Sequence, residues 1–195
     1  MKSLAEWIKV DIGSTGEDDA EQAVPHTDLL VDNMAAAWGG IAYAELSIVL
    51  VHLRYLAFVH QTHHWIAKGD PFYADHQMFE RLYNGTVKEI DAVAEKAVGL
   101  GNEQNVNLAL QVSQLQQLCK AYGSPQTVPQ SSELARASLV AECNFLKILK
   151  ACCESMRSQG IETPGVENLL HGIADAHEGY VYLLKRRCAQ GALGF

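Results

Sequence analysis

The chain has 195 residues, of which 48% are hydrophobic, and a formal net charge of −8. A chain of this length can bury a core in one domain without disulfides or a structural metal. The negative charge argues against a protein that binds nucleic acid through its phosphates, since such proteins present a basic face, and it favours the attraction of cations.

Residues 1–32 are predicted to form an acidic arm ahead of a folded domain at residues 33–191. The arm has no apolar segment followed by a cleavage site, so it does not resemble a secretory leader, and we expect a cytoplasmic protein. Its one amphipathic patch suits docking on a neighbouring subunit and comprises Leu4, Trp7 and Ile8.

Glycine and proline divide the rest of the chain into long segments with helical periodicity, and the alternation typical of strands is nearly absent. The fold class is therefore predicted to be all-α. The first long helix is expected to begin between Asn33 and Ile41 and to end at Gly69. Its apolar stripe continues in phase into His60 and His64. The helix is not expected to span a bilayer, because polar side chains interrupt it at Glu45, His52 and Arg54.

The second long helix is predicted to start with Asp70 as N-cap and Pro71 at the first helical position, and to close near residues 99–101. A glycine at Gly85, in the middle of this helix, costs about 1 kcal/mol relative to alanine, which indicates a close approach of another backbone. The core face of the helix is expected to comprise Phe72, Phe79, Tyr83, Val87, Ile90, Ala94 and Val98.

A shorter helix is expected at about residues 105–121, followed by a linker with the sequence YGSPQTVP. The third long helix is predicted to run from Ser131 or the next residue to Gly160, and the fourth from a cap at Thr163 to about Gly191. Two helix pairs joined by a crossover that carries a short helix are typical of a ferritin-like four-helix bundle. The cysteines are odd in number and lack zinc-finger spacing, so we expect reduced, buried thiols at Cys119, Cys143, Cys152, Cys153 and Cys188.

Four potential metal ligands share one face of the second helix. They span a stripe about 100° wide on a helical wheel and form two pairs one turn apart, His76 with Glu80 and Asp91 with Glu95. About 16 Å of helix separates the pairs, so the two pairs of one chain cannot bind the same metal cluster. If two copies of the helix pack antiparallel about a two-fold axis near Gly85, each pair meets the other pair of the second copy.

A histidine from the end of the first helix can lie beside His76, because the connection between the two helices is short. Two imidazoles and three carboxylates form a hard nitrogen and oxygen donor set, which suits iron(II) or manganese better than structural zinc. Either His64 or its neighbour His63 can complete the set, and His60 with His64 can form a separate site. The alternative is that the acids form a solvated helix face and that His60 is a hydrogen-bonded core residue.

Framing residues surround these candidate ligands in a fixed order: His64-Trp65, Gly69, Phe72, His76, Glu80, and the segment DAVAE from Asp91 to Glu95, followed by GLG. This pattern resembles the signature of the mini-ferritins, the Dps family (DNA-binding proteins from starved cells), and the resemblance covers about residues 40–188. It implies a ferroxidase that binds iron at sites shared across a two-fold interface. The implied ligands are His64, His76 and Glu80 from one subunit and Asp91 and Glu95 from its partner.

The resemblance also implies a hollow homo-dodecamer that oxidises iron(II), preferentially with hydrogen peroxide rather than dioxygen. Such a shell stores the ferric mineral and protects the cell against oxidative stress, and it has no membrane partner. Trp65 is implied to lie near the iron and to quench radical side reactions.

Two departures from the family pattern bear on function. Glu80 stands where the family more often has aspartate, and the acidic arm stands where some members carry a lysine-rich tail, which argues against DNA binding. A small basic cluster at Lys185, Arg186 and Arg187 is equally well explained as a solvated face. The alternatives are a ferritin-like shell or stress protein without ferroxidase activity, and a ferritin with an iron pair inside one bundle. The latter requires Glu-x-x-His motifs, which neither Glu80 nor Glu142 begins.

Overall fold

The structure of the chain is a computed structural model that describes residues 34, 36–122 and 131–190. Within these ranges the ordered elements are helices, with no strand. They follow in the order α3 (Ala44–Ile66), α4 (Phe72–Leu100), the 3₁₀ turn η1 (Glu103–Val106), α5 (Leu108–Tyr122), α6 (Ser131–Ser158) and α7 (Pro164–Gln190). None of the described helices combines the length and the hydropathy needed to cross a membrane. The predicted arm and most of the predicted linker lie outside the described residues.

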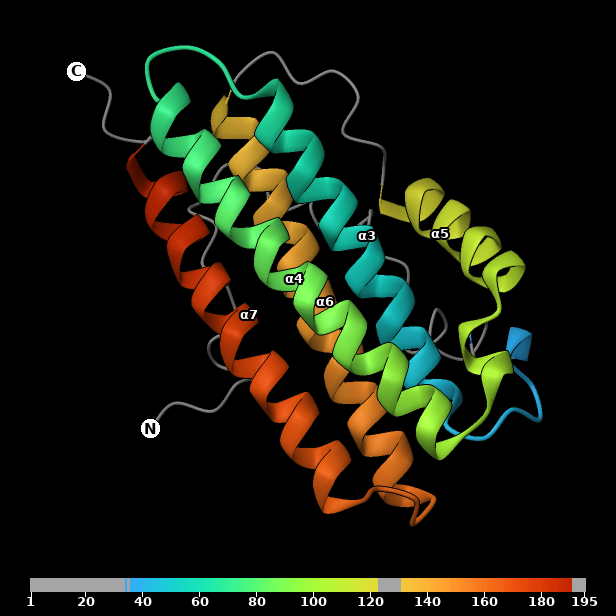
Figure 1. Cartoon of the computed structure of the whole chain (residues 1–195). Helices are drawn as coiled ribbons and strands as arrows, with labels where there is room; N and C mark the ends of the chain where they lie inside the picture. The colour runs from blue at the N-terminus through green and yellow to red at the C-terminus, as the bar shows by residue number, and fades with distance from the viewer. Residues whose placement is uncertain (1–33, 35, 123–130, 191–195) are drawn as a thin grey trace, which may run out of the picture.

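The four long helices pack side by side in a bundle (Figure 1). α3 packs along α4, and α6 packs along α7. α3 also packs on α6, and α4 also contacts α7, so the two pairs close into one bundle. α5 lies outside the bundle against α3, within the crossover between α4 and α6. This arrangement confirms the predicted all-α, ferritin-like fold with a short extra helix between the second and third long helices.

The first long helix starts later than predicted. Residues 34, 36 and 37 are helical, but α3 begins only at Ala44. Gly40 and Tyr43 have left-handed conformations with φ angles of 79° and 57°, and these interrupt the helix. A positive φ at a tyrosine has no signature in the sequence, which is why the predicted range ended too early, at Ile41.

The segment before α3 nevertheless belongs to the folded core. Met34 and Trp38 are fully buried. Trp38 Nε1 donates a hydrogen bond to Oε1 of Gln114 on α5 at 2.8 Å, and Gln114 Nε2 donates to the carbonyl of Met34 at 3.1 Å. These bonds fasten the segment to α5.

The predicted cap of the second long helix is wrong. Pro71, not Asp70, occupies the N-cap position of α4, and no side chain accepts a hydrogen bond there. Gly69 has a φ of 84°, and its carbonyl accepts the N–H of Phe72 at 2.9 Å. A backbone turn that needs the conformational freedom of glycine therefore starts the helix.

The later boundaries agree more closely with the predictions. The hydroxyl of Thr163 accepts the N–H of Val166 at 3.2 Å and caps α7, which starts at Pro164. The short helix begins at Leu108, later than predicted, because Asn102 first caps the 3₁₀ turn with both halves of a capping box.

The buried apolar side chains form two clusters with a polar layer between them. The larger cluster follows α3 and reaches the second half of α4 and much of α6 and α7; its members include Leu50, Val93, Phe145 and Ile173. The smaller cluster lies where α4 and α6 begin and α7 ends, and includes Phe79, Leu82, Leu134 and Leu184. Along all four helices, the residues between these clusters include buried polar side chains: His60, His63, Thr86, Ser138, Glu142 and His177.

An ion pair fastens the end of α7 to the start of α4. Arg187 donates from Nε and a terminal nitrogen to both carboxylate oxygens of Asp75, at 2.6 and 2.9 Å. Asp75 is fully buried, so this bidentate pair replaces the water that its carboxylate loses. Arg187 therefore serves the fold and does not form a solvated surface cluster with Lys185 and Arg186.

Gly85 makes room for a side chain of the same chain. A Cβ added at Gly85 would lie 1.9 Å from the hydroxyl oxygen and 3.1 Å from the Cζ of Tyr180, on α7. This contact accounts for the glycine in the middle of α4, and the close approach of another backbone is not needed to explain it.

The cysteines are less buried than predicted. All five are free thiols, but only Cys152 and Cys153 are buried; Cys119 is exposed, and Cys143 and Cys188 are half-buried.

Candidate metal centre

His64, at the end of α3, and His76, near the start of α4, form a stacked pair. Their ring centroids lie 3.7 Å apart, with 22° between the ring planes. His64 is 9% exposed, and His76 is half-buried. Trp65, which follows His64, is 67% exposed. The short connection between α3 and α4 thus brings together the two histidines that the motif singled out.

Each histidine of this pair is hydrogen-bonded to the backbone of the other. Nδ1 of His64 donates to the carbonyl of His76, and Nδ1 of His76 donates to the carbonyl of His64, both at 2.9 Å. A carbonyl oxygen can only accept, so each Nδ1 carries a hydrogen, and a neutral ring then has its lone pair on Nε2. Metal-binding histidines are commonly oriented by such a bond from the second ring nitrogen. Each ring can therefore offer one nitrogen to a metal.

The other two histidines of this stretch face the bundle interior. His63 is fully buried, and its Nδ1 lies 2.7 Å from the hydroxyl of Ser138, on α6. Burial, reinforced by His60, lowers the pKa of His63 to about 3 and keeps it neutral. His60 is also fully buried, and its Nε2 donates to Glu142 at 2.6 Å. His64 is thus the histidine of this stretch that lies against His76.

The candidate carboxylates lie on α4, apart from the histidine pair. Glu80 is half-buried, and one of its oxygens accepts a hydrogen bond from Gln77 Nε2 at 3.3 Å. Asp91 and Glu95, farther along the helix, are exposed. In the part of the chain that the structure describes, no three His, Cys, Asp or Glu side chains are grouped so that they could hold a metal ion. The structure of one chain therefore brings together His64 and His76 but not the full predicted set.

Aromatic and apolar side chains surround the histidine pair. The ring of Phe72 lies 5.1 Å from that of His76, and the ring of Tyr83 lies 5.4 Å from that of His64, edge to face. Phe72 and Val87 were predicted to be core residues, but they are 43% and 51% exposed. The other helices of the same chain therefore cover only part of the apolar stripe of α4.

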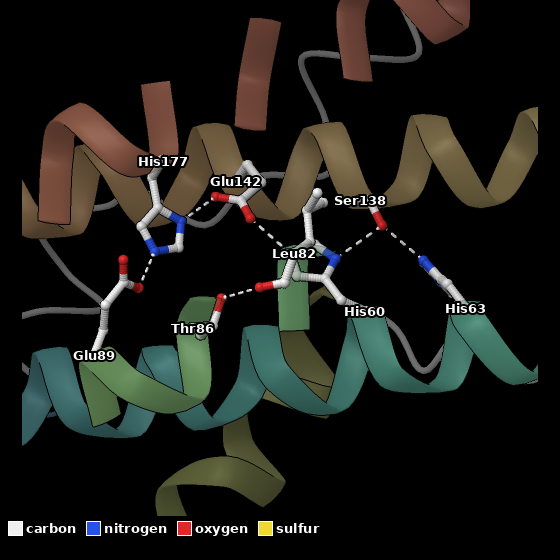
Figure 2. A network of polar contacts seen from close by, with 8 residues as sticks. All are labelled: His60, His63, Leu82, Thr86, Glu89, Ser138, Glu142 and His177. Atoms are coloured by element: carbon white, nitrogen blue, oxygen red, sulfur yellow. Dashed lines mark hydrogen bonds and ion pairs between the residues drawn. The ribbon is translucent and has the colours of Figure 1, made fainter. Parts of the chain in front are cut away.

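A polar network inside the bundle was not predicted from the sequence (Figure 2). Glu142, on α6, is fully buried and accepts hydrogen bonds from His60 Nε2 at 2.6 Å and from His177 Nδ1 at 2.5 Å. Nε2 of His177, on α7, donates to Glu89 of α4 at 2.8 Å. Nδ1 of His60 lies 3.2 Å from the hydroxyl of Ser138. We call these five residues the interior network; together with His63, which bonds to Ser138, they connect all four long helices.

The interior network holds a buried positive charge. A carboxylate can only accept hydrogen bonds, so both ring nitrogens of His177 carry hydrogen and the ring is an imidazolium. Burial alone would lower the pKa of His177, but the charges of Glu142 and Glu89 and their hydrogen bonds outweigh it and raise this pKa to about 9. Burial would raise the pKa of Glu142, yet His177 and His60 lower it to about 2. At neutral pH the network therefore keeps His177 charged between two carboxylates.

Glu45, the buried acid at the start of α3, bonds to neighbouring side chains of the same chain. Glu45 accepts hydrogen bonds from the hydroxyl of Ser155 at 2.7 Å and from Gln159 Nε2 at 2.6 Å. Both partners belong to the end of α6 and the turn after it, so these bonds fasten the start of α3 to α6.

Comparison with known proteins finds two sequence relatives and several solved structures, whereas no protein-family model matches the chain. The chain is 34% identical over 62 residues to "DNA protection during starvation protein 2" of Bacillus anthracis, a match that covers 31% of this chain and 41% of that protein. It is 25% identical over 118 residues to "Nutrient stress-induced DNA-binding protein" of Nostoc sp. (strain PCC 7120), which covers 59% of this chain and 62% of that protein. The chain thus spans less than two thirds of either relative.

The fold is similar to that of "DpsC from Streptomyces coelicolor", with a TM-score of 0.58 over 89% of this chain and 90% of that one. The sequence identity to that structure is 17%, so this likeness concerns the fold. The two sequence relatives agree with the resemblance to the Dps family, and the structural neighbour shares the ferritin-like fold.

Proposed function

We propose that the chain is the subunit of a mini-ferritin that oxidises iron(II), with hydrogen peroxide as the favoured oxidant, and stores the ferric product in a hollow dodecamer. Iron is both the substrate and the cargo. The proposed site takes His64, His76 and Glu80 from one subunit and Asp91 and Glu95 from a second.

The observation that carries this proposal is the reciprocal hydrogen bonding of His64 and His76. It fixes the orientation of both rings and leaves the lone pair of each Nε2 available. Imidazole nitrogens combined with carboxylates form a donor set that suits iron(II). A pair of imidazoles stacked by chance in a core would not require both Nδ1 atoms to be fixed in this way.

The need for a second subunit follows from the length of α4. The pair at His76 and Glu80 is separated from the pair at Asp91 and Glu95 by about 16 Å of helix. Two antiparallel copies of α4 bring the pairs of different subunits together in two equivalent sites. The exposed side chains of Phe72 and Val87 on the same helix suit burial in such an interface.

The proposed reaction balances without releasing a radical. Two iron(II) ions each lose one electron, hydrogen peroxide accepts both electrons, its O–O bond breaks, and two protons complete two molecules of water. The neutral imidazoles donate lone pairs, and the carboxylates stabilise the greater positive charge of the iron(III) product.

Stopped-flow oxidation of iron(II) by peroxide tests the activity. We expect the unaltered protein to accelerate oxidation over buffer, and the His76→Ala and Asp91→Ala variants to lose most of that acceleration. The native mass of each variant is the control, because a change in assembly would also slow the reaction. No acceleration by the unaltered protein, or undiminished acceleration by both variants, would overturn the proposal.

Mixed subunits test whether the sites are shared. His76→Ala and Glu95→Ala subunits are each expected to be inactive alone. When the two are refolded together, a dimer with one of each should contain one intact site and one doubly altered site, and should regain about half of the activity of the unaltered dimer. Verified mixed dimers without recovered activity would contradict shared sites.

The names of the two sequence relatives refer to DNA protection and DNA binding. For this chain we propose protection by removal of iron(II) and peroxide rather than by DNA binding, because the net charge is −8 and Arg187 is paired with a buried carboxylate. An iron pair inside one bundle is less well supported, because Glu142 and the two histidines beside it bond to one another.

A further inference from the structure

We propose that the interior network positions the proposed iron ligands from inside the bundle, and that Glu142 is its central positioning residue. This inference rests on the proposed function, since the ligands that it concerns are those of the proposed iron site. Neither Glu142 nor its partners touches the iron in this proposal.

One end of the network lies behind the ligand of α3. His60 precedes His64 by one helical turn and is bonded to Glu142 and Ser138. His63, next to His64, is bonded to the same Ser138 hydroxyl at 2.7 Å. A helix held at two positions of its inner face cannot rotate about its axis there, so these bonds fix the direction in which His64 leaves α3.

The other end lies behind the ligands of α4. Glu89 accepts the hydrogen bond of His177, and its side chain is 15% exposed. Asp91 follows Glu89 by two residues, about 200° farther around the helix, and is exposed. Because the inner face of α4 is fastened at Glu89, the outer face that carries Asp91 and Glu95 has a fixed orientation.

Glu142 joins the two ends. One of its oxygens serves the α3 end through His60, and the other serves the α4 end through His177. Its carboxylate lies between two apolar clusters. Without it, two imidazole N–H groups would be buried and unpaired, which favours rotation of both rings.

Small rotations matter for the proposed site. Metal ligands need placement to within about 0.5 Å, and the loss of groups that orient ligands typically weakens metal binding by about 10- to 100-fold. The interior network reaches the ligand turns of both α3 and α4.

If Glu142 only stabilised the fold, its loss would affect metal binding no more than the loss of another buried polar residue. Gln114, on α5, provides that matched control. Gln114 is 1% exposed and makes two buried hydrogen bonds, as Glu142 does. It lies on a helix that carries no proposed ligand. Gln114→Met and Glu142→Met therefore both remove a buried, doubly bonded polar group, and only Glu142 supports the ligand turns. Glu142 also carries a charge, so Glu142→Gln separates the loss of this charge from the loss of the acceptor.

The experiment measures cobalt(II) binding to the full-length unaltered protein and to three variants: Glu142→Met, Glu142→Gln and Gln114→Met. Cobalt(II) separates binding from oxidation, and its visible absorption reports the geometry of the ligands. We expect Glu142→Met to bind cobalt about 10- to 100-fold more weakly with a changed spectrum. Glu142→Gln should have an intermediate cobalt affinity, because its amide oxygen can still accept a hydrogen bond from His177. Gln114→Met should keep the affinity and spectrum while losing stability in urea unfolding.

Unchanged cobalt affinity and spectrum in Glu142→Met would overturn the inference, and so would equal weakening by Gln114→Met. If Glu142→Met does not fold, Ser138→Ala tests the α3 end alone: weaker binding with a shifted spectrum supports the inference, and unchanged binding overturns it.

Absence of the proposed metal site would look different, because the unaltered protein would then bind neither cobalt(II) nor iron(II). In that case crystal structures of the unaltered protein and the variant still test positioning, through the separation of the His64 and His76 rings, now 3.7 Å. An unchanged separation would count against the inference, and a changed one would support it.

Discussion

Two buried histidines of this chain show that the neighbours of a buried imidazole, more than burial itself, decide its charge. His52 is 2% exposed, its Nδ1 donates to the carbonyl of Ile48 at 2.9 Å, and its Nε2 has no partner among the described residues. Burial lowers the pKa of His52 to about 4, so the ring stays neutral. His177 is buried as deeply, but two carboxylates keep it charged.

This difference predicts how stability depends on pH. The pKa of His177 is about 9 in the folded chain and has an ordinary value of 6.5. A raised folded pKa contributes stability that is fully present below pH 6.5 and is lost as the pH rises through about 9. We expect the free energy of unfolding to fall by up to about 3 kcal/mol from this group over that interval.

Urea unfolding of the unaltered protein and of His177→Gln at several pH values measures the effect. The advantage of the unaltered protein should be largest near pH 6 and should shrink as the pH approaches 10. Because cysteines and tyrosines titrate in both proteins, the difference between the two curves isolates His177. A difference that stays constant with pH would contradict the charged ring.

At the scale of the helices, features that depend on near neighbours in the sequence could be predicted. Helical periodicity, together with the cap at Thr163, predicted the bounds of three of the long helices to within a few residues. The pairing of candidate ligands on α4, one turn apart, follows from the helical repeat alone. The start of α3 was wrong because Tyr43 takes a left-handed conformation that only the fold imposes.

The interior network could not be predicted in this way. Glu142 and His177 are 35 residues apart in sequence, and Glu89 and His177 are 88 apart, so only the packing of the helices brings them together. In the sequence each is simply a polar residue within a helical pattern. The contact of His64 rather than His63 with His76 is another case, because the bond between Ser138 and His63 decides which ring turns inward.

Gly85 allows a prediction at the same scale. Alanine is favoured over glycine in a helix by about 1 kcal/mol, but a Cβ at this position would meet the hydroxyl of Tyr180 at 1.9 Å. We expect Gly85→Ala to destabilise the fold by about 1–3 kcal/mol, because overpacking displaces the tyrosine.

A double-mutant cycle with Tyr180→Phe measures this clash directly. The cost of Gly85→Ala should be smaller when it is introduced into the Tyr180→Phe variant, where the hydroxyl is gone. A stabilising Gly85→Ala in the unaltered background would show that the Tyr180 ring moves away freely.

At the scale of the whole molecule, the boundary between the proposed arm and the bundle can be tested by truncation. We propose that residues 33–191 form the folded domain. A chain that starts at residue 33 keeps Met34 and Trp38, both fully buried, whereas a chain that starts at residue 42 loses them. The first is expected to unfold near the temperature of the full chain, and the second several degrees lower, because burial of large apolar side chains contributes roughly 2–3 kcal/mol each. Equal melting temperatures for the two truncated chains would contradict the boundary.

The reciprocal hydrogen bonds between His64 and His76 affect how much each of the two rings would contribute to metal affinity. Each ring is held by the backbone carbonyl of the other residue, and a substitution of that residue's side chain leaves this carbonyl in place. In the proposed site the two Nε2 atoms would form one chelating unit that is ordered before a metal arrives, so that binding of the second nitrogen would cost little further entropy. Replacement of one ring leaves the other ring oriented, so each single substitution is expected to weaken metal binding less than the double substitution does.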